Sequence, residues 1–587
     1  MSPTNDAAAQ RSPEERAAEL LTRMTLREKA GLMFHTITTL DPLDANAFGL
    51  GSTKEFLERG IVHFNVHGSA DDPKVIARHH NEMQKLALSI GAKVPITISS
   101  DPRHAFSHNV LASMMAGCFS EWPESLGMVA LQDEKRMEEY CDIMRQEYVA
   151  SGIRAALHPQ VDLATQPLWS RIAGGLGEDA DLASRLTAAY VRGIQGAVLG
   201  PESVSACVKH FPGGGPERDG YDCHMPWGAE QDYPGDQFNY HLKPFRAAVD
   251  SGVRQVMPSY GKPMATKFPE VAFGFNKEVL HGVLRKDLGF KGIILSDWLI
   301  LEGVPGSKDD ALQAKAWGVE HLSLDERIIM SLDAGVDQFG GNTCVDALVK
   351  LVESGKVPES RIDRSALLLL EEKFRLGIFD NPYVDEEKAT TIVGKDEFRQ
   401  AGLRAQSDSL TLLQNRKSSK DGKPILPLAK GTKVFLEGFA SVPEKYSGDV
   451  VSSASEADAI IVRMDTPWTP IGEGELARQW HHGPLDFKPE QLERIAELAK
   501  LAPVVFDIYC DRPPVLGSIV DSASAIFCNY GVREEILLSV IYGEASPKGK
   551  LPFDLPRSNE AVIASRCDVA FDTKDPVFRF GHGLSYE

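Results

Sequence analysis

The sequence predicts an α/β protein in which a (β/α)₈ TIM-like barrel is followed by a second α/β domain. Short apolar runs alternate with amphipathic stretches of helical period as far as about residue 375, and polar side chains follow several of these runs directly. A second alternating set begins after residue 405. Continuous apolar strands separated by helices are typical of a parallel sheet that is covered on both faces.

The chain length supports two domains, because 587 residues exceed what a single hydrophobic core usually supports. We expect a catalytic barrel over residues 1–375, a linker over 376–405 and an α/β sandwich domain over 406–587. The sandwich is predicted from four apolar runs, at residues 433–436, 459–462, 504–508 and 525–528.

We expect the barrel to begin with a helix after Ser12. Ser12 can cap this helix, Pro13 suits its first position and Glu15 can complete a capping box. Seven strands follow, at residues 60–64, 94–98, 155–158, 204–208, 253–257, 292–295 and 335–339. An eighth strand is presumed but not located, so a barrel in which it is weakened or lost stays open. The strands run into Asp101, Asp162, Lys209, Tyr260 and Asp297. A barrel gathers such strand ends around one pocket, which favours it over a doubly wound sheet.

The composition limits the class of partner. A formal net charge of -20 argues against binding to nucleic acid or an anionic membrane, because both reward clustered Lys and Arg. The eight cysteines are scattered singly, as reduced and buried thiols are. The first 20 residues lack a basic segment followed by an apolar run, and no stretch is long and apolar enough to span a bilayer. We expect a cytoplasmic enzyme that acts on a neutral substrate without a cofactor or metal. A secreted enzyme whose signal peptide has been removed would show the same N-terminal sequence pattern.

Asp297 is the predicted nucleophile of a glycoside hydrolase. Cleavage of a glycosidic bond with retention needs a carboxylate at the anomeric carbon and an acid about 5 to 5.5 Å away. Asp297 ends an apolar strand, where a barrel opens to solvent, and Trp298 beside it can stack on a sugar ring. An Asp in this position could also cap the next helix, so the interpretation depends on further residues.

Other strand ends supply groups that recognise hydroxyls. Lys209 and His210 precede Gly213, Gly214 and Gly215, a run that lets the backbone turn sharply and approach a ligand. Its spacing does not match a phosphate-binding GxxxxGK[ST] loop. Asp101 can accept two hydrogen bonds from a sugar diol, and Arg171 can complete the clamp.

These residues lie in an order that resembles glycoside hydrolase family 3. The resemblance covers nearly the whole chain and includes DLATQPLWSR from Asp162, KHFPGGG from Lys209, MPSY from Met257, SDW from Ser296 and the terminal FGHGLSYE. It implies a barrel with an α/β sandwich domain and an exo-acting, retaining β-glucosidase. Carried over by position, it makes Asp297 the nucleophile and places the nonreducing-end sugar against Asp101, Arg171, Lys209, His210, Met257 and Tyr260. One departure is Ala105, which stands where the family pattern has a glycine after His104.

The acid/base is left open. The resemblance implies a Glu from the second domain, for which Glu473 is the first choice and Glu475 the second. Asp222 and His224 resemble instead the Asp-x-His pair that N-acetylglucosaminidases of the family use, with a longer spacing from the glycines. His481 and His482 follow the Glu-bearing loop and could also lie near the pocket.

Several alternatives remain for the activity. Within the family these are a β-xylosidase and a β-N-acetylglucosaminidase, because a few loop contacts change the preferred sugar. Outside it they are a metal-dependent barrel hydrolase with His210 and several Asp as ligands, and an inactive sugar-binding relative. A homodimer is one arrangement that would complete the site.

Overall fold

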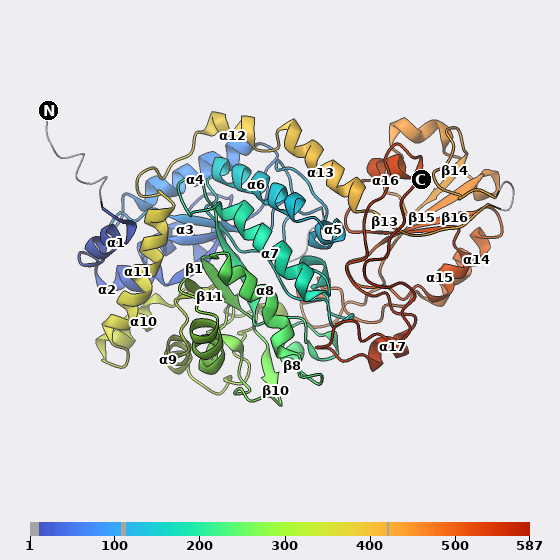
Figure 1. The fold of residues 1–587 in the computed structure, drawn as a ribbon. Coiled ribbons are helices and arrows are strands. Elements are labelled where there is room, and N and C mark those ends of the chain that lie inside the picture. Colours follow the sequence, from blue (N-terminus) through green and yellow to red (C-terminus); the bar gives the residue numbers. More distant parts are fainter. Residues whose placement is uncertain (1–10, 107–112, 419–421, 587) are drawn as a thin grey trace.

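A closed barrel forms the first part of the molecule in a computed structural model that describes residues 11–106, 113–418 and 422–586. Within these residues eight parallel strands close in the order β1-β12-β11-β9-β7-β6-β5-β4. Figure 1 shows two of them, β1 and β11, among the helices of this part of the molecule. Their bounds are β1 (Phe34–Thr39), β4 (His63–His67), β5 (Thr97–Ser100), β6 (Ala155–Ala156), β7 (Ser205–Phe211), β9 (Gln255–Pro258), β11 (Ile293–Trp298) and β12 (Gln338–Gly340). The predicted barrel fold is therefore confirmed.

The barrel is complete, and β1 is the strand that the apolar runs did not locate. A search for apolar runs misses it, since only Phe34 and Ile37 of its six residues are apolar. Its polar side chains His35, Thr36 and Thr38 are buried in the barrel. His35 explains how: its Nε2 lies 2.7 Å from Ser99 Oγ, and its Nδ1 lies 3.3 Å from Gln338 Oε1. Hydrogen bonding inside the barrel makes a polar strand stable there.

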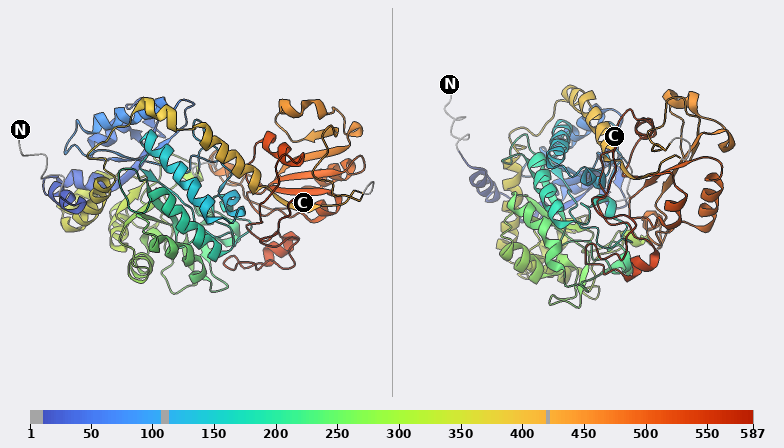
Figure 2. Two further views of the ribbon diagram at one scale, coloured as in Figure 1. Left: turned by 45° about the horizontal axis from the view of Figure 1, so that its top comes forward. Right: turned by 45° about the vertical axis from the view of Figure 1, so that its right-hand side comes forward.

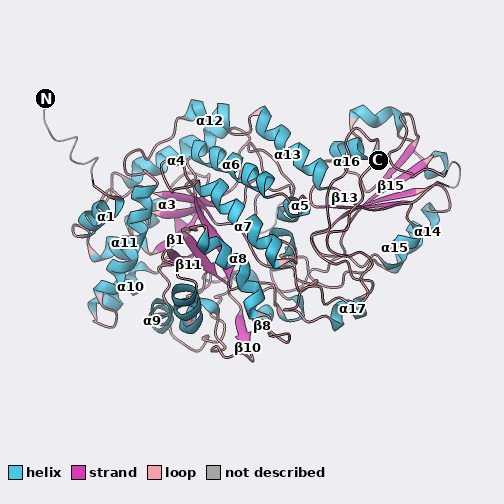
Figure 3. Ribbon diagram, in the orientation of Figure 1, coloured by secondary structure: helices cyan, strands magenta, loops and turns pink. Residues whose placement is uncertain are grey.

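Helices surround the barrel, as Figure 3 shows by colour. They are α1 (Pro13–Leu21), α2 (Leu26–Leu32), α3 (Thr53–Glu58), α4 (Pro73–Ala87), α5 (Ser125–Ala130), α6 (Glu134–Ser151), α7 (Ala180–Gln195), α8 (Phe238–Asp250), the π-helix Glu278–Asp287, α9 (Leu324–Ala334), α10 (Val345–Glu353) and α11 (Glu359–Arg375). The predicted capping box of α1 is confirmed, because Ser12 accepts from the backbone of Glu15 and Glu15 accepts from that of Ser12. No helix among the described residues combines the length and apolar character that crossing a membrane requires.

Two helices occupy the stretch predicted as a linker, α12 (Glu386–Ile392) and α13 (Asp396–Ser409). α12 packs on α4 and α6 of the barrel. α13 contacts α5 of the barrel and also α16 (Glu534–Ile541) of the second domain. Both views in Figure 2 show α13 running from the barrel to the second domain. The connection is therefore helical, and the residue at which one domain ends and the next begins remains a prediction.

The second domain is built on a five-stranded sheet in the order β13-β17-β16-β15-β14. Its elements are β13 (Thr411–Asn415), β14 (Val434–Glu437), β15 (Ala459–Asp465), β16 (Val504–Tyr509), β17 (Ala525–Asn529), α14 (Pro489–Leu498), α15 (Gly517–Ser522), α16 (Glu534–Ile541) and α17 (Asn559–Ala564). The four predicted strands are parallel to one another, and β13 adds an antiparallel edge. Alternate residues of β15 face two separate apolar cores, Ile460 in one and Ile461 in the other, so the sheet is covered on both faces.

The chain returns to the barrel after the sheet. The backbone N–H of Lys550 donates to the carbonyl of Ala130, and that of Glu178 donates to the carbonyl of Pro552. Asp568 accepts from the backbone of Gly235 and Gln237 beside α8. The two domains are thus joined by hydrogen bonds from residues far apart in the sequence.

Candidate active site

A cavity at the carboxyl end of the barrel strands brings the predicted residues together. We call it the first cavity, and its walls include Asp101, Arg171, Lys209, His210, His224, Met257, Tyr260, Asp297 and Trp298. Every sugar-contacting residue that the sequence predicts lies in this wall, together with the predicted nucleophile. The end of the strands is where side chains from different strands of a barrel converge.

The carboxylate of Asp297 has two oxygens in different environments. Its Oδ1 accepts from the hydroxyl of Tyr260 and from the backbone N–H of Trp298, each over 2.7 Å. Its Oδ2 is buried and has no hydrogen-bond partner among the described residues, with His210 Nε2 at 3.6 Å. One oxygen is therefore fixed and the other is available to a ligand.

Asp101 forms an ion pair with Lys209 on another part of the wall. Lys209 Nζ lies 2.8 Å from Asp101 Oδ1, and the Asn65 amide donates to Oδ2 over 3.0 Å. Burial raises the pKa of Asp101, but the charge of Lys209 and these hydrogen bonds outweigh burial and hold the pKa below its ordinary value. The carboxylate is thus ionised, and an ionised carboxylate has further acceptor positions for sugar hydroxyls.

His210 is held between Asp162 and Arg171. Its Nδ1 lies 2.7 Å from Asp162 Oδ2, and Arg171 Nη1 donates to its Nε2 over 2.9 Å. Since Arg171 is a donor only, Nε2 accepts and Nδ1 carries the proton. Burial lowers the pKa of His210, and Arg171 lowers it further, against the effect of Asp162. The imidazole is therefore neutral, in one tautomer.

The glycine run does not line the cavity, contrary to the expectation that it approaches a ligand. A Cβ on Gly215 would clash with the carbonyl oxygen of Leu163, so glycine is required by the chain's own loop. The backbone N–H of Gly214 donates to Asp162 Oδ1 over 2.6 Å. The run supports His210 indirectly, because the same carboxylate holds the imidazole.

His224 lines the first cavity and pairs with Asp222, which is buried behind it. His224 Nδ1 lies 2.7 Å from Asp222 Oδ1, while Trp169 Nε1 donates to Asp222 Oδ2 over 2.8 Å. Burial raises the pKa of Asp222, but His224 outweighs it and the pKa is lowered. Burial also lowers the pKa of His224, against the opposing charge of Asp222. The ring of His224 packs 4.7 Å from that of Tyr260, so Tyr260 contacts both His224 and Asp297.

Glu473 and Glu475 lie on a second-domain loop that reaches the barrel. The backbone of this loop is fixed, since the N–H of Glu473 donates to Asp310 Oδ2 and that of Leu476 donates to Asp309 Oδ2. Leu476 lines the first cavity. Both glutamate side chains, however, are exposed, and neither forms part of the cavity wall.

Three residues of the site are not predicted from the sequence, namely Asn65, Lys315 and Trp480. Asn65 lies near the end of β4, so the same strand-end rule could have found it. Lys315 lines the first cavity, where its Nζ donates to the carbonyls of Ala311 and Gln313. Trp480 packs 4.6 Å from the ring of His224, and Arg171 lies 5.8 Å from its ring centre. No local pattern marks Lys315 or Trp480, because tertiary packing brings them to the site. In the described part of the chain, no group of three or more His, Cys, Asp or Glu residues could hold a metal ion.

The geometry agrees with comparisons to known proteins. Residues 59–371 match the model of the glycosyl hydrolase family 3 N terminal domain, and residues 343–586 match that of the C-terminal domain. The sequence is 45% identical over 579 residues to probable beta-glucosidase C of Aspergillus flavus, covering 98% of this chain and 90% of the relative. It is 37% identical over 602 residues to the periplasmic beta-glucosidase/beta-xylosidase of Dickeya chrysanthemi, covering 97% and 90%.

Solved structures show the same fold at lower identity. The β-glucosidase structure from Erythrobacter marinus superposes with a TM-score of 0.81 at 23% identity, covering all of this chain and 84% of that one. The structure of an exo-1,3/1,4-beta-glucanase mutant from a Pseudoalteromonas species gives 0.78 at 21% identity, covering 98% and 95%. The two family matches and the full-length relatives make this barrel protein a glycoside hydrolase. The chain belongs to glycosyl hydrolase family 3.

Proposed function

We propose that this glycoside hydrolase is an exo-acting, retaining β-glucosidase that releases β-D-glucose from the nonreducing end of small glycosides. The single observation that carries the proposal is the carboxylate of Asp297. Two hydrogen bonds fix its Oδ1, while its buried Oδ2 has no partner among the described residues. A nucleophile that attacks the anomeric carbon needs such an oriented, unshared oxygen.

The reaction proceeds in two displacements. In the first, Asp297 Oδ2 attacks the anomeric carbon, the glycosidic bond breaks and the leaving oxygen takes a proton from an acid. In the second, a water that has lost a proton to the same group attacks the anomeric carbon and releases Asp297. Asp101, Lys209, Arg171 and His210 bind the ring hydroxyls with oriented polar groups, and Trp298 and Met257 contact the sugar face.

His224 is the proton donor that the geometry favours. It lines the cavity of Asp297, and Asp222 holds its ring through a 2.7 Å contact. The ordinary pKa of histidine suits an acid/base in a two-step displacement, and the charge of Asp222 opposes the lowering of the His224 pKa by burial. Glu473 and Glu475 remain the alternative donors, although their exposure in this structure gives them no support.

The sugar, the assembly and the location are proposals as well. Glucose is favoured because the Aspergillus relative bears that activity in its name, and xylose is the second candidate because the Dickeya relative is also named a β-xylosidase. A homodimer and a cytoplasmic location stay predictions.

A substrate panel with a trapping experiment tests the proposal. The wild type is assayed on p-nitrophenyl β-glucoside, β-xyloside and β-N-acetylglucosaminide, with and without a chelator. A 2-fluoro-glucosyl fluoride should add one fluoroglucosyl group to the peptide that contains Asp297. Asp297→Ala should lose turnover, whereas Asp333→Ala, at an exposed position of α9, should not. An α-anomer as the first-formed product, or activity that the chelator removes, would contradict the proposal.

A further inference from the structure

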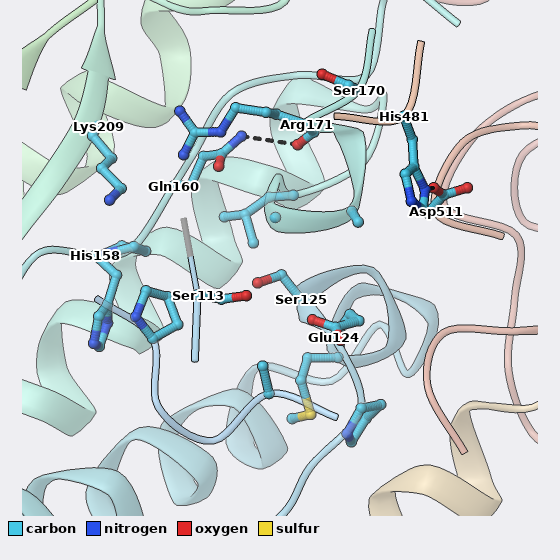
Figure 4. A pocket seen from close by; sticks show the side chains of 18 of the residues that line it. Ser113, Glu124, Ser125, His158, Gln160, Ser170, Arg171, Lys209, His481 and Asp511 are labelled. Atoms are coloured by element: carbon cyan, nitrogen blue, oxygen red, sulfur yellow. Dashed lines mark hydrogen bonds and ion pairs between the residues drawn. The ribbon is translucent and has the colours of Figure 1, made fainter. Parts of the chain in front are cut away.

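A second cavity lies between the barrel and the second domain (Figure 4). Its barrel wall includes Glu124, Ser125, Gln160 and Ser170, and its second-domain wall includes Trp480, His481 and Asp511. In Figure 4 the side chains of His481 and Asp511 enter from one side, opposite Lys209. Both domains are thus needed to form it.

Lys209 and Arg171 line both cavities. The side-chain groups that contact the Asp297 carboxylate, from Tyr260 and His210, belong to the first cavity alone. Under the proposed function, Asp297 lies next to the anomeric carbon of the bound glucose. Lys209 and Arg171 bind its ring hydroxyls, so the second cavity adjoins the side of the sugar that carries these hydroxyls.

The second cavity contains polar groups that lack a partner. Ser170 and Asp511 are each 5% exposed. Ser170 Oγ and Asp511 Oδ1 are buried with no hydrogen-bond partner among the described residues, although the other oxygen of Asp511 lies 2.6 Å from His481 Nδ1. A buried polar atom without a partner is costly, and a ligand hydroxyl would relieve that cost.

The character of the wall favours a neutral, hydroxyl-rich occupant. Hydroxyl, amide, imidazole and carboxylate groups all offer hydrogen bonds to a sugar, and Trp480 adds an aromatic ring. An anionic group such as a phosphate is disfavoured, since Glu124 and Asp511 face the cavity and the charge of Lys209 is already paired with Asp101. A purely apolar group would leave these polar atoms unpaired.

We propose that the second cavity binds a further sugar unit attached to a ring hydroxyl of the glucose in the first cavity. The enzyme then cleaves glycosides of such a disaccharide and releases the disaccharide intact. This inference rests on the proposed β-glucosidase function and specifies its substrate class.

Glycosides with an α-linked outer sugar test the inference. We would assay p-nitrophenyl β-nigeroside, β-maltoside and β-isomaltoside, which carry an α-glucosyl group on O3, O4 and O6 of the inner glucose. An enzyme specific for β-linkages leaves the α-bond uncut, so p-nitrophenol appears only together with an intact disaccharide. Product analysis should show that disaccharide from at least one of the three, and no free glucose.

A variant that fills the second cavity provides the control. Ser125 begins α5 and lines only the second cavity, so Ser125→Trp should lower kcat/KM for the accepted disaccharide glycoside about tenfold and that for p-nitrophenyl β-glucoside less than about twofold. Ser360→Trp, at an exposed position in the first turn of α11, should change neither.

The outcomes separate the two proposals. Turnover of p-nitrophenyl β-glucoside without turnover of any of the three disaccharide glycosides would overturn the inference alone. Equal turnover of an accepted disaccharide glycoside by wild type and Ser125→Trp would overturn it too. Failure of the wild type on p-nitrophenyl β-glucoside would overturn the proposed function and this inference with it.

Discussion

Tyr260 donates its phenolic hydrogen to Oδ1 of Asp297 over 2.7 Å. The backbone N–H of Trp298 donates to the same oxygen, so the carboxylate cannot rotate without losing both bonds. Tyr260 itself is buried, and burial together with the neighbouring carboxylate raises its pKa well above the ordinary value. The phenol therefore stays protonated and keeps the Asp297 carboxylate oriented.

Removal of this hydroxyl should slow catalysis while the aromatic ring still fills its place in the cavity wall. We expect Tyr260→Phe to lower kcat/KM for p-nitrophenyl β-glucoside roughly ten- to hundredfold, because a hydrogen bond to a charged group contributes about 1.5–3 kcal/mol. Tyr383→Phe, at an exposed position, is the matched control. An unchanged kcat/KM in a folded Tyr260→Phe enzyme would show that the bond does not position Asp297.

The leaving group distinguishes the candidate proton donors. We expect His224→Ala to lower kcat/KM for cellobiose about 10²- to 10⁴-fold, because its alkoxide leaving group needs a proton. The loss on 2,4-dinitrophenyl β-glucoside should be much smaller, since that phenolate leaves without protonation. Glu473→Gln and Glu475→Gln should leave both substrates unaffected. The opposite pattern would assign the role to the second-domain loop.

The buried pair of Lys209 and Asp101 should matter for stability as well as for sugar binding. Lys209→Met leaves the Asp101 charge buried without its cation, which we expect to lower the free energy of unfolding by about 3–5 kcal/mol. The double variant with Asp101→Asn should regain part of this loss without regaining activity. Arg557→Met, which breaks an exposed pair with Asp575, should cost less than about 1 kcal/mol. Equal losses in denaturant unfolding would contradict the expectation.

Lys315 should give the stability a distinctive pH dependence. Burial lowers its pKa to about 7, although Asp297 and Asp309 oppose this. Between about pH 7 and 10 the unfolded chain binds a proton at Lys315 that the folded protein does not. The free energy of unfolding therefore rises with pH through this group, by at most about 1.4 kcal/mol per unit. It loses that contribution as the pH falls toward 7.

Lys315→Met removes this effect. Thermal unfolding of wild type and variant from about pH 6.5 to 9.5 should show the wild type gaining stability relative to the variant as the pH rises, because all other groups titrate in both proteins. A stability difference that stays constant with pH would show that Lys315 keeps its proton in the folded state.

The sequence predicted the parts of the molecule that local rules control. Asp101, Lys209 and Asp297 follow apolar strands, and parallel strands in a barrel must bring their ends together. The strand Phe34–Thr39 was missed because it contains buried His and Thr side chains, of which His35 has partners on two other strands. The strand Thr411–Asn415 was missed because its apolar stretch is short.

The rest of the site depends on packing between distant segments. Nothing near Glu473 in the sequence reveals that its side chain faces solvent, nor does anything near His224 reveal that Tyr260 and Trp480 enclose its ring. Ser170 and Asp511 share a cavity only because the two domains meet there. Such contacts follow from tertiary structure, for which sequence spacing carries no information.

The return of residues 550–568 to the barrel has a consequence for biosynthesis. Ala130, Glu178 and Gly235 gain their partners only when that late segment has left the ribosome. The loop around Leu476, which forms part of the wall beside Asp297, is also made after the barrel. A nascent chain that has completed β12, the last barrel strand to be made, therefore holds all of the proposed sugar-binding side chains but not a finished pocket. Activity should therefore appear late in translation, and a chain stalled before residue 550 should have no glycosidase activity.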